Sequence, residues 1–506
     1  MLKAVKYLFI FAMILVWSLQ QIHAQKTTKV KLIRANELLM DDHFNKDIQR
    51  LIGNVVMLHD STYFYCDSAW LNRKANNFLA FSKVHIVVSD TLEIFGDSLI
   101  YDGATRVADL HGNVKLVDNR ATLTTNHLTY DRKTRIAYYY TGAVIVSDSN
   151  VLTSRVGHYY TDDKEVYFRD QVVLTNPDYV MKSDTLKYNT VSKTSWFFGP
   201  STIVGEEDSI YCEDGWYNTE LDVSRLKRNV FVQHNEQILM GDTVFYRRSP
   251  RYGMAESNVV LHDTDQDVYV MGHFAEYDED LNYAFVTDSA LAIMPEKKDS
   301  LFLHADTMWM LTNDRGKAQL MKAYYKVKYF RQDLQGMCDS LVYHFSDSTI
   351  IMYNEPVMWS EENQLTSDSV TIVIRNNEID SMVLHGSCFI ISEDDSIYDH
   401  YNQIKGLTMI AYFKDNELVK IKVTGNAETL YFLREEDRSL IGIQKAISNR
   451  MIIYLDSNQI RGFTYIDKPD GAIHTVDELS EQDLILRDFK WLDDRRPLKK
   501  EDIFAW

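Results

Sequence analysis

The sequence predicts an all-β fold made of stacked two-strand repeats, each about 29 residues long. The strand-forming residues Val, Ile, Thr, Tyr and Phe recur in short alternating runs. Proline occurs only 7 times in 506 residues, whereas Asp, Asn and Gly mark frequent tight turns. The strongest observation is that two short patterns alternate along most of the chain.

The first pattern has six positions. They hold a small residue, then Asp, then either Ser or Thr, then an apolar residue, then any residue, and finally Tyr. Its clearest copies are residues 96–101, 183–188, 241–246 and 338–343. Including weaker copies, the Asp slot recurs at intervals of 29 to 33 residues, at Asp67, Asp97, Asn126, Arg155, Asp184, Glu213, Asp242, His273, Asp306, Asp339 and Asp368. A regular interval over this many copies indicates a structural repeat.

The second pattern is Gly-Asn-Val followed by an alternating apolar residue, and it lies between copies of the first. It occurs at residues 53–55 and 112–114, with variants at 228–230, 257–259 and 425–427. Each repeat therefore contains two strands, one through each pattern.

The apolar positions change parity at the Asp slot. Leu92 and Ile94 precede the slot on one parity, while Leu99 and Tyr101 follow it on the other. Because side chains alternate along a strand, such a switch at a fixed point predicts a bend or bulge. The repeated Asp-Ser/Thr is then a corner whose side chains satisfy backbone groups. A calcium-binding roll is not indicated, since its Gly-Gly-x-Gly-x-Asp nonapeptides are missing.

Residues 1–24 are predicted to be a secretory signal peptide. Lys3 and Lys6 precede an apolar run over residues 7–17, and the small residue Ala24 closes the segment. The run is shorter than the roughly 20 apolar residues that cross a bilayer, although an uncleaved anchor stays open as an alternative. The mature protein is therefore expected outside the cytoplasm.

The rest of the chain is expected to have two parts. Residues 25–430 form the β-repeat region, and residues 431–506 form a less regular β end with a short helical tail. The tail begins at about Thr475 and contains an aromatic and basic group of residues, Phe489, Trp491, Arg495 and Arg496. Both capping of the stack and docking on a partner are open roles for this tail.

Charge and missing motifs exclude several classes of function. The net charge of −19 argues against a nucleic-acid partner, because phosphate binding needs a basic face. Known nucleophile, Walker, dinucleotide and zinc-protease motifs are missing from the sequence, and the 15 histidines are scattered. We therefore expect no enzymatic activity, no cofactor and no metal.

The cysteines are expected to be buried and unpaired. Cys66, Cys212 and Cys338 occupy the slot before the Asp position, four or five repeats apart. Strands stacked about 4.8 Å apart put such residues roughly 19 Å from one another, too far for a disulfide. Cys388 falls outside this phase.

The alternation of the two patterns resembles the OstA/LptA family of lipopolysaccharide transport proteins, over roughly residues 35–430. The resemblance implies an elongated β-jellyroll or β-taco, in which strands fold into an open V around an apolar groove. It also implies that the groove receives the acyl chains of lipid A in the periplasm, and that stacked modules form a bridge toward the outer membrane. End-to-end strand pairing with homologous β-jellyroll proteins is implied as well, and self-association stays open. Pro200 and Pro356 depart from the pattern, where each replaces the Asn before a strand.

The resemblance further implies which residues line the groove. These are the inward positions of both strands of the repeat: Val55, Met57, Leu99, Tyr101, Val114, Leu116, Leu128, Tyr130, Val144, Val146, Val172, Leu174, Leu186, Tyr188, Val230, Val232, Val244, Tyr246, Val259, Leu261, Leu341 and Tyr343. Two other functions stay open: a structural or adhesive β-solenoid with a solid interior, and a carbohydrate-active β-helix enzyme.

Overall fold

The structure is a computed structural model that contains two compact units, residues 1–206 and 207–506. It describes residues 28–506 except 41–46, 120, 207, 248, 250, 296–298, 314–316, 377, 396–398, 415–416, 436, 438 and 457–458. The predicted signal peptide therefore lies outside the described residues. Among the described residues, no helix has the length and apolar character needed to cross a membrane.

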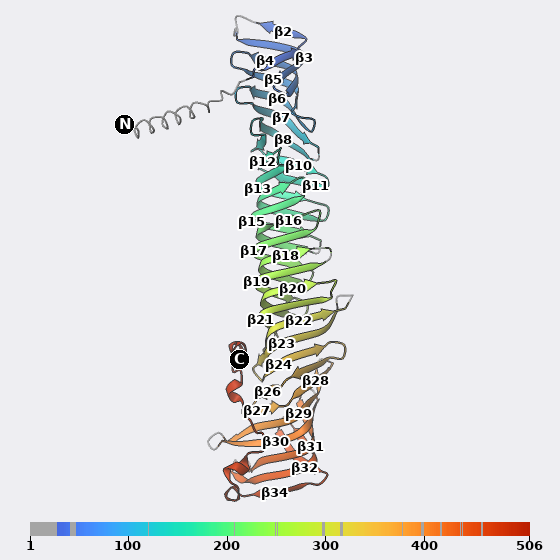
Figure 1. The fold of residues 1–506 in the computed structure, drawn as a ribbon, viewed down its shortest axis with the longest axis vertical. Coiled ribbons are helices and arrows are strands. Elements are labelled where there is room, and N and C mark those ends of the chain that lie inside the picture. The colour runs from blue at the N-terminus through green and yellow to red at the C-terminus, as the bar shows by residue number, and fades with distance from the viewer. Residues whose placement is uncertain are drawn as a thin grey trace, which may run out of the picture. The chain divides into compact units, whose positions relative to one another are not determined.

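In the first unit, antiparallel strands follow one another in chain order and each long strand pairs with the next (Figure 1). The strands are β1 (Lys31–Arg34), β2 (Glu37–Met40), β3 (Ile48–His59), β4 (Thr62–Asn72), β5 (Asn77–Val87), β6 (Leu92–Asp102), β7 (Val107–Asp118), β8 (Ala121–Asp131), β9 (Ile136–Tyr139), β10 (Ala143–Ser147), β11 (Asn150–Ser154), β12 (Val156–Tyr160), β13 (Glu165–Thr175), β14 (Tyr179–Asn189) and β15 (Thr194–Gly205).

The second unit continues the same antiparallel order. Its strands are β16 (Asp208–Asn218), β17 (Val223–His234), β18 (Gln237–Arg247), β19 (Tyr252–Asp263), β20 (Val268–Asp278), β21 (Tyr283–Pro295), β22 (Ser300–Thr312), β23 (Ala318–Arg331), β24 (Leu334–His344), β25 (Thr349–Tyr353), β26 (Val357–Ser360), β27 (Asn363–Thr366), β28 (Ser369–Arg375), β29 (Glu378–Asp395), β30 (His400–Lys414), β31 (Glu417–Arg434), β32 (Leu440–Asp456), β33 (Gln459–Ile466) and β34 (Asp470–His474). The predicted all-β fold of stacked two-strand repeats is confirmed. The boundary expected at residue 430 falls inside β31.

Each long strand bends at one corner, where the pairing register shifts. In β7 the shift lies between His111 and Val114, across the Gly112-Asn113 pair. Two consecutive residues with left-handed backbone, φ +43° to +82°, mark the corner in nine strands: Gly53 and Asn54, Ser82 and Lys83, Gly112 and Asn113, Asp170 and Gln171, Arg228 and Asn229, Ser257 and Asn258, Asp288 and Ser289, Gly386 and Ser387, and Gly425 and Asn426. Gly and Asn adopt this backbone at the least cost, which explains the second sequence pattern.

Elsewhere the corner interrupts the strand completely. The break between β9 and β10 spans residues 140–142, and the break between β25 and β26 spans residues 354–356. Pro356 lies in the second break, and Pro200 follows Gly199, whose φ is +107°, in β15. Both prolines therefore stand at corners, where ladder pairing is already interrupted.

The Asp slot of the first pattern lies against these corners and holds them. Asp97 Oδ2 accepts a hydrogen bond of 2.7 Å from Asn113 Nδ2. The same side-chain bond joins Asn258 to Asp242 at 2.8 Å and Asn354 to Asp339 at 3.1 Å. The corner position of Asp-Ser/Thr is confirmed, but in these pairs the carboxylate binds the Asn side chain of the other pattern rather than a backbone group.

The corner produces the parity switch seen in the sequence. In β6, Leu92 and Ile94 are buried before the corner, and Leu99 and Tyr101 are buried after it. The extra corner residues rotate the second half of the strand, so the same face stays inward along the whole strand. We call this buried side the inner face and the opposite side the outer face.

The predicted inward positions of Val144 and Val146 are wrong. Both side chains are exposed, by 39% and 44%, while Ala143 and Ile145 are buried. Ala143 pairs with Thr125, as Val114 does, so it occupies the Val slot of the second pattern. Gly142 therefore takes the Asn slot of the second pattern, not the Gly slot that the sequence suggests. A shift of one residue along a strand exchanges its inward and outward side chains.

All four cysteines are buried and free, as predicted for Cys66, Cys212 and Cys338. Burial raises the pKa of each thiol to about 12, so the thiols stay protonated and unreactive at neutral pH. Cys388 follows Gly386 and Ser387, both with positive φ, and pairs with Gly406. It therefore takes the Val slot in a variant of the second pattern, which the sequence analysis missed.

The C-terminal tail lies on the outer face of the second unit, beside β24 and β27 (Figure 1). It contains the 3-10 turns η2 (Val476–Glu478), η3 (Glu481–Leu484), η4 (Asp493–Arg495) and η5 (Lys500–Phe504). Leu492 packs on the fully buried Trp359, and Trp491 contacts Tyr401 at 5.0 Å between ring centroids. The tail thus covers apolar side chains that would otherwise face water.

Buried glutamines bind the tail through its backbone. Gln364 Nε2 donates to the Lys490 carbonyl at 2.7 Å, and its Oε1 accepts from the Leu492 N–H at 2.7 Å. Gln403 binds the Leu484 carbonyl and the Leu486 N–H in the same way, both at 2.8 Å. Each amide therefore satisfies one donor and one acceptor of the tail backbone.

We expect Gly112→Ala to destabilise the protein by about 2 kcal/mol, because a left-handed residue gains a Cβ there. That Cβ would lie 2.5 Å from Asp97 Oδ2, a distance that atoms cannot keep. Thermal unfolding measures the change. Gly462→Ala is the control, since nothing lies within 4 Å of its Cβ. Equal melting temperatures for both variants would contradict the role of the corner.

We expect Gln364→Ala to cost about 1–3 kcal/mol, because two backbone groups of the tail lose their partners. Limited proteolysis should then cut the tail faster than in the wild-type protein. Gln266→Ala, at an exposed turn position, is the matched control. Unchanged proteolysis of the Gln364 variant would show that the amide does not hold the tail.

Candidate functional site: the inner face

The inner face is formed by two rows of side chains, one on each side of the corner. Directly paired residues on successive strands make up each row. In the first unit, one row comprises Met57, Phe64, Ile86, Ile94, Leu116 and Leu123, and the other comprises Leu71, Phe78, Tyr101, Ala108, Tyr130 and Ala137. Each of these residues is at most 2% exposed.

Aromatic side chains from both rows fill the interior of the first unit. Phe64 lies 4.6 Å from Tyr101 and 5.2 Å from Phe78, between ring centroids. Tyr139, Phe168 and Phe197, which stand closest to the corner in their strands, are also fully buried. Such packing leaves the described inner side chains of this unit in contact with one another rather than with a ligand.

Buried polar side chains link the ends of strands β3 and β6 in the first unit. His59 Nε2 lies 2.9 Å from the Thr28 carbonyl and must donate to it, so His59 Nδ1 accepts from the Tyr101 hydroxyl at 2.6 Å. Arg132 Nη1 in turn donates to that hydroxyl oxygen at 2.6 Å. His59 is 0% exposed and links β3 to Tyr101 of β6. We call this arrangement a latch.

A second latch joins β7 to β12. The Asp118 carboxylate, 4% exposed, accepts from the Tyr159 hydroxyl at 2.5 Å and from Lys164 Nζ at 2.6 Å. Burial together with the nearby carboxylate raises the pKa of Tyr159, which keeps the hydroxyl protonated as a donor. The two latches connect the ends of the strands across the interior.

The inner face of the second unit differs over β16–β22, because both rows are partly exposed. One row joins Val232, Leu239, Leu261 and Val270, all half-buried. The other row includes Tyr246 and Tyr277, which are 38% and 39% exposed. Residues next to the corner are fully buried here, such as Leu226, Val244 and Val259. Ser224 in the second row is buried too, and so are Ala292 and Leu303, where the first row ends on β21 and β22. We call the two rows over β16–β22 the open strip.

Smaller side chains explain this opening. Next to the corner, Ala255 and Val286 take the slot that Phe168 and Phe197 fill in the first unit. The open strip also has Leu239 and Val270 where the first unit has Phe64 and Ile94. Less side-chain volume between the strands leaves apolar surface in contact with solvent.

The latch residues recur in the second unit without closing it. His234 and Tyr277 occupy the slots of His59 and Tyr101, three strands apart. His234 Nδ1 instead lies 2.6 Å from Asp208 Oδ1, and its side chain is 48% exposed. Apolar rows with a polar rim therefore face solvent in this part of the chain.

Apart from Val144 and Val146, which face outward, the residues predicted from the resemblance divide into three sets. Those that are packed inside the first unit are Val55, Met57, Leu99, Tyr101, Val114, Leu116, Leu128, Tyr130, Val172, Leu174, Leu186 and Tyr188. Val230, Val232, Val244, Tyr246, Val259 and Leu261 lie in or beneath the open strip, and Leu341 and Tyr343 lie further along the second unit. Leu239, Val270 and Tyr277 were missed, although their alternation with the corner predicts their inward position.

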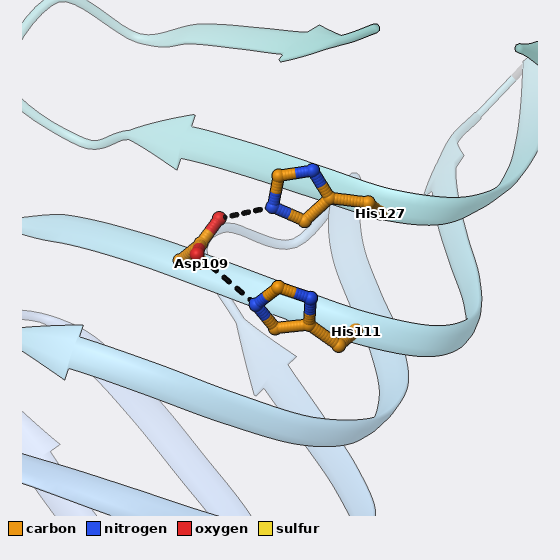
Figure 2. Close-up of side chains that lie close together, drawn as sticks. All are labelled: Asp109, His111 and His127. Atoms are coloured by element: carbon orange, nitrogen blue, oxygen red, sulfur yellow. Dashed lines mark hydrogen bonds and ion pairs between the residues drawn. The ribbon is translucent and has the colours of Figure 1, made fainter. Parts of the chain in front are cut away.

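One group among the described residues could hold a metal ion: Asp109, His111 and His127. The group lies on the outer face of β7 and β8 and is separate from the inner face (Figure 2). In the sequence these histidines look scattered because His111 and His127 lie 16 residues apart. Pairing of β7 with β8 brings them together.

We expect acid to destabilise the fold through His59. Burial lowers the pKa of His59, so the folded state keeps the ring neutral. As pH falls through about 6.5, His59 binds a proton in the unfolded chain but stays neutral in the folded chain. The free energy of unfolding therefore decreases with falling pH until the lower pKa of the folded state is reached. Melting temperatures at pH 7.5 and 5.5 measure this loss.

The His59→Gln variant is the test of that assignment. Its melting temperature should fall less between the two pH values than that of the wild-type protein. An unchanged pH dependence would place the sensitivity at other groups, such as His158 or His304, whose pKa is also lowered by burial.

Comparisons with known proteins give a family match to part of the chain. The model of the OstA-like protein family matches residues 27–184, a shorter stretch than residues 35–430. This chain is similar to a solved structure of LptH from Pseudomonas aeruginosa, which is described as the LptA homologous periplasmic component of the conserved lipopolysaccharide transport device. The similarity covers 20% of this chain and 76% of the LptH chain. The identity is 18% and the TM-score is 0.19. No curated protein matches the chain.

Proposed function

We propose, from the premise that residues 27–184 belong to the OstA-like family, that this protein carries lipopolysaccharide in the periplasm. The acyl chains of lipid A would lie on the open strip of the second unit, and the headgroup would stay in solvent. The single observation that supports this is the half-exposed apolar inner face over β16–β22.

The physical argument is the cost of exposing an acyl chain. A chain of about 12 carbons in water costs on the order of 10 kcal/mol, at about 0.8 kcal/mol per CH₂. The row of Val232, Leu239, Leu261 and Val270 offers apolar cover on successive strands. Because neighbouring positions have similar apolar side chains, they have similar binding free energies. A lipid can therefore move along the row without first escaping from a single tight site.

Charge decides the orientation of the lipid. The chain has a net charge of −19, and a phosphorylated headgroup is also negative. Repulsion between them favours a pose in which only the acyl chains are enclosed. The rim residues Asp208 of β16 and Asp263 of β19 agree with that pose, since carboxylates beside the strip would repel phosphate.

The first unit would serve as a rigid support rather than as part of the groove. Its packed interior and its two latches leave no apolar inner surface for a ligand in the described part of this unit. The same observation favours a second candidate function for this unit alone, that of a structural β-solenoid.

Partner binding would take place at the free edge of the first unit. Among the described strands, β1 and β2 pair with β3 alone. Leu38, Leu39 and Met40 of β2 are exposed by 42%, 48% and 65%. An open, apolar strand edge adds a strand from a partner readily, so a homologous β-jellyroll protein fits this end.

We expect Leu261→Asp to weaken binding of lipopolysaccharide about 10-fold or more, because a carboxylate in the strip must be desolvated against acyl chains. Met254→Asp is the matched control on the same strand, since Met254 is also half-buried but stands on the outer face. Binding of a labelled lipopolysaccharide to both purified variants measures the difference.

Photo-crosslinkers distinguish the open strip from the packed unit. A crosslinker at Leu261 should label the lipid, whereas one at Tyr188, 4% exposed in the first unit, should not. Equal labelling at both positions would contradict the location, and a purified protein without any bound or binding lipid would leave the structural solenoid as the function.

A further inference from the structure

We propose that Asp109, His111 and His127 form a binding site for one divalent transition metal ion of the zinc class on the outer face of the first unit. The proposal is independent of lipid binding on the inner face. Asp109 and His111 stand two residues apart in β7 and therefore share a face. His127 of β8 pairs directly with His111, and Thr129 pairs with Asp109.

The three side chains converge on one point. His127 Nε2 lies 2.6 Å from Asp109 Oδ1, and His111 Nε2 lies 3.1 Å from Asp109 Oδ2. Figure 2 shows both imidazole rings turned toward the carboxylate, and their centroids are 4.5 Å apart, with planes 18° from parallel. All three ligand atoms lie within 4.8 Å of one another.

These distances fit a small ion after a small adjustment. Zinc binds imidazole nitrogen and carboxylate oxygen at about 2.0–2.2 Å, which places tetrahedral ligand atoms roughly 3.3 Å apart. The contact between Asp109 and His127 must therefore lengthen by roughly 0.7 Å, and the contact between Asp109 and His111 by roughly 0.2 Å. Its side chain and both imidazoles are partly exposed, by 31%, 46% and 27%, so they have room to move and an ion can reach them.

The surroundings of the carboxylate resemble those of a metal ligand. Thr129 Oγ1 donates to Asp109 Oδ1 at 2.8 Å and orients it from the paired position on β8.

The donor set selects the class of ion. Two imidazoles and one carboxylate suit zinc, copper or nickel, whereas calcium and magnesium prefer sites made only of oxygen. Each neutral ring can shift its proton from Nε2 to Nδ1 when Nε2 binds the metal, so no net proton loss is needed. Three protein ligands leave a fourth position for water or for a donor from another molecule.

Zinc titration of the full mature protein without a histidine tag tests the proposal. In competition with a chromophoric zinc chelator, we expect one zinc per chain. His111→Ala and His127→Ala should each weaken binding about 10-fold or more, by the loss of one ligand. Asp109→Asn should weaken it in the same direction without changing the size of the side chain.

His85→Ala is the matched control. His85 lies 2.9 Å from Glu93 between β5 and β6, a pair of one imidazole and one carboxylate without a second histidine. This variant should bind zinc as the wild-type protein does. Circular dichroism checks that each variant is folded, and Asp109→Asn decides the outcome if a histidine variant unfolds.

Two results would overturn the proposal. One is a wild-type protein that does not take up stoichiometric zinc, which would leave a hydrogen-bonded cluster only. The other is zinc binding that Asp109→Asn and the folded histidine variants retain at full strength, which would place the ion elsewhere on the chain.

Discussion

The hydrogen bond between an Asp-slot carboxylate and the Asn at a left-handed corner is the contact on which this architecture depends. In the Asp97 and Asn113 pair, the carboxylate binds the side chain of one left-handed residue and leaves no room for a Cβ on the other, Gly112. The strand must bend there, and it bends at the same place on each neighbouring strand. Without that bend, the two halves of each strand would turn opposite faces to the interior.

The corner fixes which side chains face inward, but their volume decides what the interior does. In the first unit, Phe and Tyr side chains meet across the bend, and the latches of His59 and Asp118 close the mouth. In the open strip, Ala255 and Val270 take equivalent slots, and the apolar rows remain partly exposed. One repeat thus produces both a packed interior and a partly exposed apolar one, through changes in side-chain size and in the latches.

Outer-face side chains do not pack in the interior that the corner defines. Their residue types can therefore differ from repeat to repeat. On the second unit it carries the tail, held by buried glutamines that bind backbone groups. On the first unit it carries the pair of His111 and His127 beside Asp109. A side chain on this face affects the packing of the interior very little, which allows separate binding features on a regular fold.

The sequence by itself determined the repeat length, the two strands per repeat, the corner and the inward parity, because the 29-residue spacing and the alternation are local properties of the chain. It misplaced Val144 and Val146 by one residue, since Gly142 fits two registers and only strand pairing with Thr125 selects one. Whether the interior is packed or open, where the tail lies, and that His127 meets His111 depend on contacts between strands. Those contacts join residues far apart in the sequence, so only the tertiary structure decided them.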